Sequence, residues 1–232
     1  ILPPLDDIKI VMYVRHQVDF AAVIFSELVR MGSAASRDTF LAGKRSRDLL
    51  NYYGGLSIWA DRFGDDAIVV RPFERDQFVN RDVTTDFFDI AGIDHGLIED
   101  DSVAHVRNSR KTLDRNATTL LEMFNLAVEA ELLRRGKKAK MKDFKVVRHR
   151  RLIVDALEQM PASSDRFTLN KAQAKKVINE VKEGNKLLEK RFKVKLPPPP
   201  EIPTGKASQL SGEELMQYCA ALWTETDFPH VK

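Results

Sequence analysis

The sequence predicts an α/β fold in which a parallel sheet is followed by a helical cap. Two short runs, at 8–14 and 67–70, are almost uninterrupted in apolar and β-branched residues, which is typical of strands buried on both faces. Helical spacing fills the interval between them, so we expect parallel strands joined by a right-handed crossover. After Gly92 no further strand pattern occurs, and helical patterns take over.

Helical spacing predicts three helices in the first part of the chain, each ended by a glycine. They are expected at 17–31, 49–63 and 82–91, before Gly32, Gly64 and Gly92. The last of them carries Val83, Phe87 and Ile90 on one side, which is the expected buried face. Residues 33–47 are polar and basic with little periodicity, so they are expected to form a surface excursion.

The second part of the chain is expected to be helical and then extended. Helices are expected at 112–135, 143–160, 170–192 (with Thr168 as N-cap) and 212–223 (with Ser211 and Glu214 as a capping box). The four prolines at 197–200 predict an extended polyproline segment. We therefore divide the chain into an α/β core (1–112), a helical cap (113–195), and a proline-rich strap with a terminal helix (196–232).

Composition excludes several classes of protein. A net charge of +3, from 37 basic and 34 acidic residues, gives no indication of nucleic acid or membrane binding. Cys219 is the single cysteine, which excludes an internal disulfide and a multi-cysteine metal site and fits a cytoplasmic protein. The histidines lack metal-ligand spacing. No apolar run approaches the roughly 20 residues that span a bilayer.

Arg15 ends the first predicted strand, immediately before a predicted helix. Open α/β sheets bind ligands at this edge, and a guanidinium beside a helix N-terminus suits a phosphate. The alternative is that Arg15 only pairs with an acidic residue on that helix. His16, next to it, is a candidate to orient a substrate or act as a base, and its alternative role is a hydrogen bond within a loop.

The order of several segments carries further information. They read IVMYVRHQVDFAAVIFSELVRMG, LLNYYGGLSIWADRFGDDAIVVRPFERDQF and DVTTDFFDIAGID, with weaker continuations in LDRNATTLLEMFN and INEVKEGNKLLEKRF. This order resembles a bacterial P-loop sulfotransferase-like family over about residues 1–195. The resemblance implies a parallel-sheet core of that type, incomplete at its N-terminus, with a helical C-terminal cap.

The resemblance also implies transfer of a sulfuryl group from 3'-phosphoadenosine 5'-phosphosulfate to a hydroxyl of a carbohydrate or small acceptor. In the family, a strand-end arginine and a helix serine hold the cofactor's 3'-phosphate, and Arg15 matches that arginine. The family's serine position holds Val23 here, so Ser26, on the same helix face, is the candidate. His16 and Arg71 are candidates to bind substrate; for Arg71, in RPFER, an Arg–Glu pair that closes a loop is the alternative.

The family's phosphosulfate loop, and often its catalytic base, would precede residue 1. We therefore expect the 232-residue chain alone to be inactive, and the protein to be an enzyme where the full-length chain carries that loop. The catalytic base, the acceptor and the oligomeric state stay open.

The alternative function is a non-catalytic binding or assembly module that uses the basic segment 134–151. This segment has ten Lys and Arg residues against one acid, Asp143. It would contact an anionic glycan, a lipid or a protein partner, although such runs usually form a solvated helix face. Nucleic acid is not expected, because Phe144 is the segment's only aromatic residue for base stacking.

Overall fold

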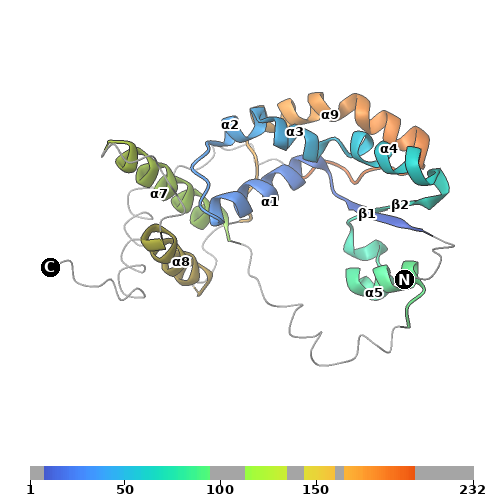
Figure 1. Ribbon diagram of the computed structural model, residues 1–232, viewed down its shortest axis with the longest axis horizontal. Helices are drawn as coiled ribbons and strands as arrows, with labels where there is room; N and C mark the ends of the chain where they lie inside the picture. Colours follow the sequence, from blue (N-terminus) through green and yellow to red (C-terminus); the bar gives the residue numbers. More distant parts are fainter. Residues whose placement is uncertain (1–7, 95–112, 135–143, 160–164, 202–232) are drawn as a thin grey trace. The chain divides into compact units, whose positions relative to one another are not determined.

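The computed structural model describes residues 8–94, 113–134, 144–159 and 165–201 (Figure 1). These residues form two compact units. The first contains the described residues of Ile1–Phe20, Ala42–Arg110 and Ala174–Glu201, and the second those of Ala21–Leu41 and Lys111–Gln173. The predicted domain boundaries near 112 and 195 stay a prediction, since much of the chain around the first and after the second lies outside the described residues.

Most of the described residues are helical, and two strands form a parallel sheet. The strands are β1 (Ile10–Val14) and β2 (Ile68–Pro72). The α-helices are α1 (Gln17–Arg30), α2 (Arg37–Ala42), α3 (Lys44–Leu50), α4 (Tyr52–Phe63), α5 (Val83–Ala91), α7 (Arg115–Arg134), α8 (Phe144–Gln159) and α9 (Lys171–Phe192). Short 3-10 turns are η1 (Asp65–Ala67), η2 (Arg75–Gln77) and η3 (Val79–Arg81). The mixed α/β class is therefore confirmed.

The two strands run in parallel, as predicted, with Ile10 opposite Ile68 and Val14 opposite Pro72. The Phe73 backbone N–H donates to the Val14 carbonyl at 2.7 Å, which continues the pairing one residue past β2. The residues that follow the two strands therefore lie next to each other at the carboxyl edge of the sheet.

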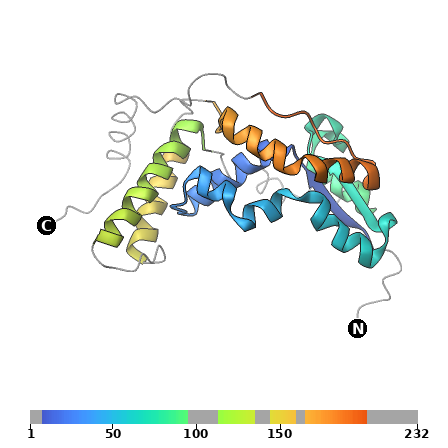
Figure 2. The ribbon, with the colours of Figure 1, turned by 90° about the horizontal axis from the view of Figure 1, so that it is seen from above.

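Helices cover both faces of this sheet. On one face Val14 and Val70 form a buried cluster with Tyr52 and Leu56 of α4 and Leu188 of α9. Figure 2 shows α4 and the C-terminal half of α9 beside each other over the strands. Because side chains alternate along a strand, Tyr13 and Arg71 point to the opposite face, where both contact α5.

The second unit has its own aromatic and polar contacts. Phe25 of α1 stacks on Phe167 at 5.6 Å between ring centroids, and lies at the same distance from Phe40. Arg37 of α2 donates to Glu122 of α7 at 2.7 Å. These contacts join α1, α2, α7 and the segment before α9 within this unit.

The expectations for residues 33–47 and for the N-cap of α9 were wrong. Residues 33–47 contain α2 and half of α3 instead of a surface excursion, with Leu41 and Ser46 buried. Helices of six and seven residues are too short to display a clear apolar period. The N-cap of α9 is Asn170, not Thr168: the Asn170 side chain accepts from the Gln173 N–H at 2.9 Å, and the Gln173 side chain accepts from the Asn170 N–H at 3.2 Å.

The proline strap is described as far as Glu201 and has no helix or strand after Phe192. Val194 and Leu196 pack against the core of the first unit. The predicted terminal helix 212–223, its cap at Ser211 and Cys219 lie outside the described residues. Among the helices that the structure describes, none is long and apolar enough to cross a membrane.

Candidate anion site at the carboxyl ends of the strands

Arg15 lies between β1 and α1, at the carboxyl edge of the sheet. Its guanidinium carbon lies 4.0 Å from the ring centroid of Phe73, the residue after β2. Its Nη1 lies 3.5 Å from the carboxylate of Asp19, at the outer limit for a hydrogen bond. The Arg15 side chain is 29% exposed, so a ligand at this edge can reach it.

Phe73 belongs to a compact aromatic cluster with Tyr13 and Phe78. The Phe73 and Phe78 rings meet edge to face at 5.3 Å, and Tyr13 meets Phe73 at 6.3 Å and Phe78 at 5.6 Å in the same manner. Edge-to-face contacts are a preferred arrangement of aromatic rings. The ring beneath Arg15 is therefore held from two sides.

Arg71 is tied to the buried carboxylate of Asp86 on α5. Asp86 is fully buried and accepts from Arg71 Nε at 3.2 Å and Nη2 at 2.5 Å, from the Tyr13 hydroxyl at 2.8 Å and from the Val79 N–H at 3.2 Å. Burial alone would raise the pKa of Asp86, but the bonds from Arg71, Tyr13 and Val79 outweigh it and lower the pKa.

The expected Arg–Glu pair in RPFER was wrong for Arg71, since its ion-pair partner is Asp86. Glu74 accepts a hydrogen bond from Gln77 instead. Arg71 Nη2 also donates to the Gln77 carbonyl at 3.1 Å. These bonds give Arg71 a structural role at the sheet edge, and its predicted role in substrate binding stays a prediction.

His16 is the N-cap of α1. Its Nδ1 accepts from the Val18 N–H at 3.2 Å, and its carbonyl accepts from the Phe20 N–H at 3.0 Å. Burial lowers the pKa of His16, with Asp19 opposing the shift. The imidazole is therefore neutral at pH 7 with Nδ1 occupied, which matches the local hydrogen-bonding alternative. A role in binding substrate would fall to Nε2.

Ser26 does not join the group at the sheet edge. It belongs to the second unit, whereas Arg15, His16 and Arg71 belong to the first. Its hydroxyl is buried and lies 3.2 Å from the Thr118 hydroxyl of α7. The sheet edge thus brings together Arg15, His16 and Arg71, but not Ser26.

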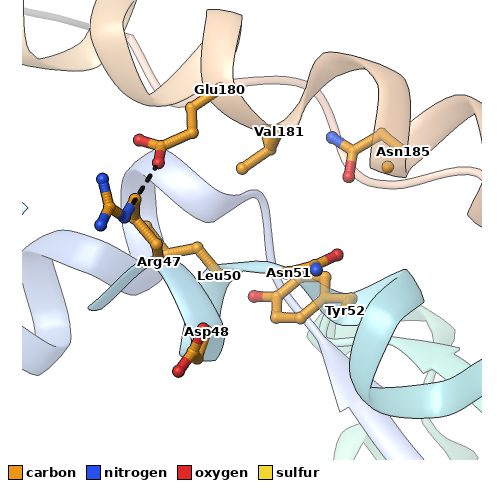
Figure 3. A pocket seen from close by; sticks show the side chains of 9 residues that line it. Arg47, Asp48, Leu50, Asn51, Tyr52, Glu180, Val181 and Asn185 are labelled. Carbon is orange, nitrogen blue, oxygen red and sulfur yellow. Dashed lines mark ion pairs between the residues drawn. The ribbon is translucent and has the colours of Figure 1, made fainter. Parts of the chain in front are cut away.

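A cavity of about 290 Å³ in the first unit was not predicted (Figure 3). It is lined by Arg47, Asp48, Leu50, Asn51, Tyr52, Glu180, Val181, Gly184 and Asn185. Arg47 and Glu180, which both line it, form an ion pair at 3.7 Å. The lining comes from the junction of α3 and α4 and from α9, so it combines charged groups, amides and one phenol ring.

The cavity adjoins the start of α1. Gln17, fully buried, exchanges two side-chain hydrogen bonds with Asn185, at 2.6 and 3.2 Å. The Asn51–Tyr52 dipeptide and the late Asn185 were visible in the sequence, but no local pattern indicates that α9 brings them together.

The basic segment 134–151 is described only in part. Arg134 forms a two-pronged pair with Glu131 at 2.7 and 2.8 Å, and Arg151 is exposed and lies 3.8 Å from Asp155. Residues 135–143 lie outside the described range. Arg134 and Arg151 therefore lie on a solvated helix surface, whereas Arg150 is half-buried against Gly32.

Comparison of the chain with family models, with curated proteins and with solved structures gives no match. Among the residues that the structure describes, no group of three or more His, Cys, Asp or Glu side chains could hold a metal ion.

Proposed function

We propose that this chain carries the 3'-phosphate-binding part of a P-loop sulfotransferase-like fold. Arg15 would hold the 3'-phosphate of 3'-phosphoadenosine 5'-phosphosulfate, and the protein would transfer a sulfuryl group to a hydroxyl of a carbohydrate or small acceptor. The observation that supports this is a partly exposed arginine at the carboxyl edge of a parallel sheet, directly before a helix.

The residues present fit this cofactor in part. The Arg15 guanidinium lies over the Phe73 ring, a contact that occupies no N–H donor, so its N–H groups would bind phosphate oxygens. The cavity beside Tyr52 adjoins the start of α1 through the Gln17–Asn185 pair and would take the rest of the nucleotide. Ser26 does not fit, because its hydroxyl is buried and bonded to Thr118.

The cofactor supplies the activated sulfuryl group, while these residues bind and orient it. Arg15 neutralises charge on the phosphate, and the Gln17–Asn185 pair fixes α1 against α9 beside the cavity. No side chain at the described edge is assigned as the catalytic base, because Nδ1 of His16 already caps α1.

Calorimetric titration of the full-length protein with 3'-phosphoadenosine 5'-phosphate tests the proposal. We expect micromolar binding that is lost in Arg15→Ala. The matched control is Arg62→Ala, which removes an exposed arginine near the end of α4 and should leave binding unchanged. Equal loss in both variants would point to net charge instead of a site.

Absence of binding to the folded full-length protein would reject the proposal. It would leave the non-catalytic module, acting through the basic segment 134–151, as the function to pursue.

A further inference from the structure

We infer that Phe73 is a positioning residue that sets how well Arg15 binds an anion. The inference rests on the proposed function, because it assumes that Arg15 is the anion-binding group. Arg15 and Phe73 each follow a strand, and the Phe73 N–H bond to Val14 fixes the two backbones at the same level. The ring thereby comes to lie 4.0 Å from the guanidinium carbon.

A π face holds a guanidinium without using its hydrogen-bond donors. The ring attracts the cation through the negative potential of its face and occupies none of the N–H donors of Arg15. A carboxylate in the same place would occupy the donors that a phosphate needs. Phe73 therefore orients Arg15 and leaves it competent to bind an anion.

The ring itself cannot swing away freely. Tyr13 and Phe78 contact it edge to face, and Tyr13 is in turn fixed by its 2.8 Å hydrogen bond to Asp86. The buried pair of Asp86 with Arg71 thus supports Arg15 through two aromatic rings.

Asp19 is the competing partner within the described residues. Its carboxylate lies 3.5 Å from Arg15 Nη1, at the limit of a hydrogen bond, and carries the same sign of charge as a phosphate. An incoming anion must displace it or tolerate its repulsion. Asp19→Asn should therefore strengthen binding, whereas loss of the Phe73 ring face should weaken it.

The first test needs no ligand. It is an NMR measurement of the Arg15 Nε–H proton, whose signal is assigned by its loss in Arg15→Lys. In the free protein the Phe73 ring current should shift this signal upfield. It should return to an ordinary position in Phe73→Leu and stay shifted in Phe73→Tyr. An unshifted signal in the wild-type protein would overturn the inference whether or not the protein binds nucleotide.

The second test uses 3'-phosphoadenosine 5'-phosphate as the probe. Phe73→Leu should weaken binding about 2- to 30-fold, the range expected for loss of one cation–π contact. Mono-, di- and trifluoro-phenylalanine at position 73 should weaken it stepwise, because each fluorine reduces the negative potential of the ring face while the shape is nearly kept. An affinity for the nucleotide that stays the same across the fluorinated variants would refute the positioning role of Phe73.

The two proposals fail differently. A shifted Arg15 signal without any nucleotide binding would remove the proposed function and keep the Phe73–Arg15 contact. Nucleotide binding that needs Arg15 but not the Phe73 ring would keep the proposed function and remove Phe73 from the site.

Discussion

The Tyr13 hydroxyl of β1 donates a 2.8 Å hydrogen bond to the fully buried carboxylate of Asp86 on α5. Arg71 of β2 binds the same carboxylate with two of its nitrogens. One acidic side chain therefore ties both strands to the helix beneath them. An acid at this depth is tolerated because its charge is paired and its oxygens are bonded.

Replacing Asp86 should destabilise the protein strongly. Asp86→Asn keeps the shape of the side chain but loses the charge that Arg71 and Tyr13 bind. We therefore expect the free energy of unfolding, measured in urea, to fall by about 1.5–3 kcal/mol. Asp76→Asn is the matched control, because the Asp76–Arg81 pair is exposed and such pairs contribute only about 0–1 kcal/mol. Equal effects of the two substitutions would contradict a structural role for the buried network.

The same carboxylate predicts a pH dependence. The pKa of Asp86 is lower in the folded protein than the ordinary value of about 3.9, so its ionised form stabilises the fold. That contribution is fully present above about pH 4 and is lost as the pH falls through the folded pKa. The difference in unfolding free energy between wild type and Asp86→Asn should therefore be constant from pH 5 to 7 and shrink below pH 4.

Protonation of His16 should also lower the stability of the protein, but at a higher pH than protonation of Asp86. Its pKa is lowered by burial, and Nδ1 must be unprotonated to accept from Val18. Stability should therefore be complete above the ordinary histidine pKa of about 6.5 and decline as the pH falls below it. An NMR titration of the His16 ring should give a midpoint below 6.5. A midpoint above that value would contradict the buried, neutral cap.

Two substitutions distinguish the contribution of the His16 N-cap hydrogen bond from that of its titration. His16→Ala should cost about 1 kcal/mol at pH 7, as for other lost N-caps, while His16→Asn should keep most of the stability. Both variants should lose the decline between pH 6.5 and 5. If His16→Asn loses as much stability as His16→Ala, capping does not explain the contribution of His16, and it has another function at the sheet edge.

The sequence predicted the elements that depend on local pattern. Two continuous apolar runs became β1 and β2, and long periodic stretches became α1, α7, α8 and α9. Arg15 could be placed at the sheet edge because its position follows directly from the end of β1. The contact with Phe73 depends on the register of two strands 58 residues apart, from Ile10↔Ile68, which no local pattern contains.

Helix α5 shows where local pattern fails. Its expected buried face included Phe87, yet Phe87 is 41% exposed and the acidic Asp86 is buried. Hydrophobicity alone would turn Asp86 to solvent. The partners that reverse this choice, Tyr13 and Arg71, come from the two strands, so the helix rotation is decided by tertiary contacts.

The family resemblance and the structure give different roles to Ser26: the first predicts that it binds the 3'-phosphate, and the second that it bonds Thr118. Its hydroxyl is buried and lies 3.2 Å from Thr118, so Ser26→Ala should lower stability by about 0.5–1.5 kcal/mol and leave the affinity for 3'-phosphoadenosine 5'-phosphate unchanged. Thr118→Val removes the same bond from the other side and should match the loss in stability. A drop in nucleotide affinity in Ser26→Ala, with Thr118→Val unaffected, would return Ser26 to the 3'-phosphate site and require α1 to present both residues to one ligand.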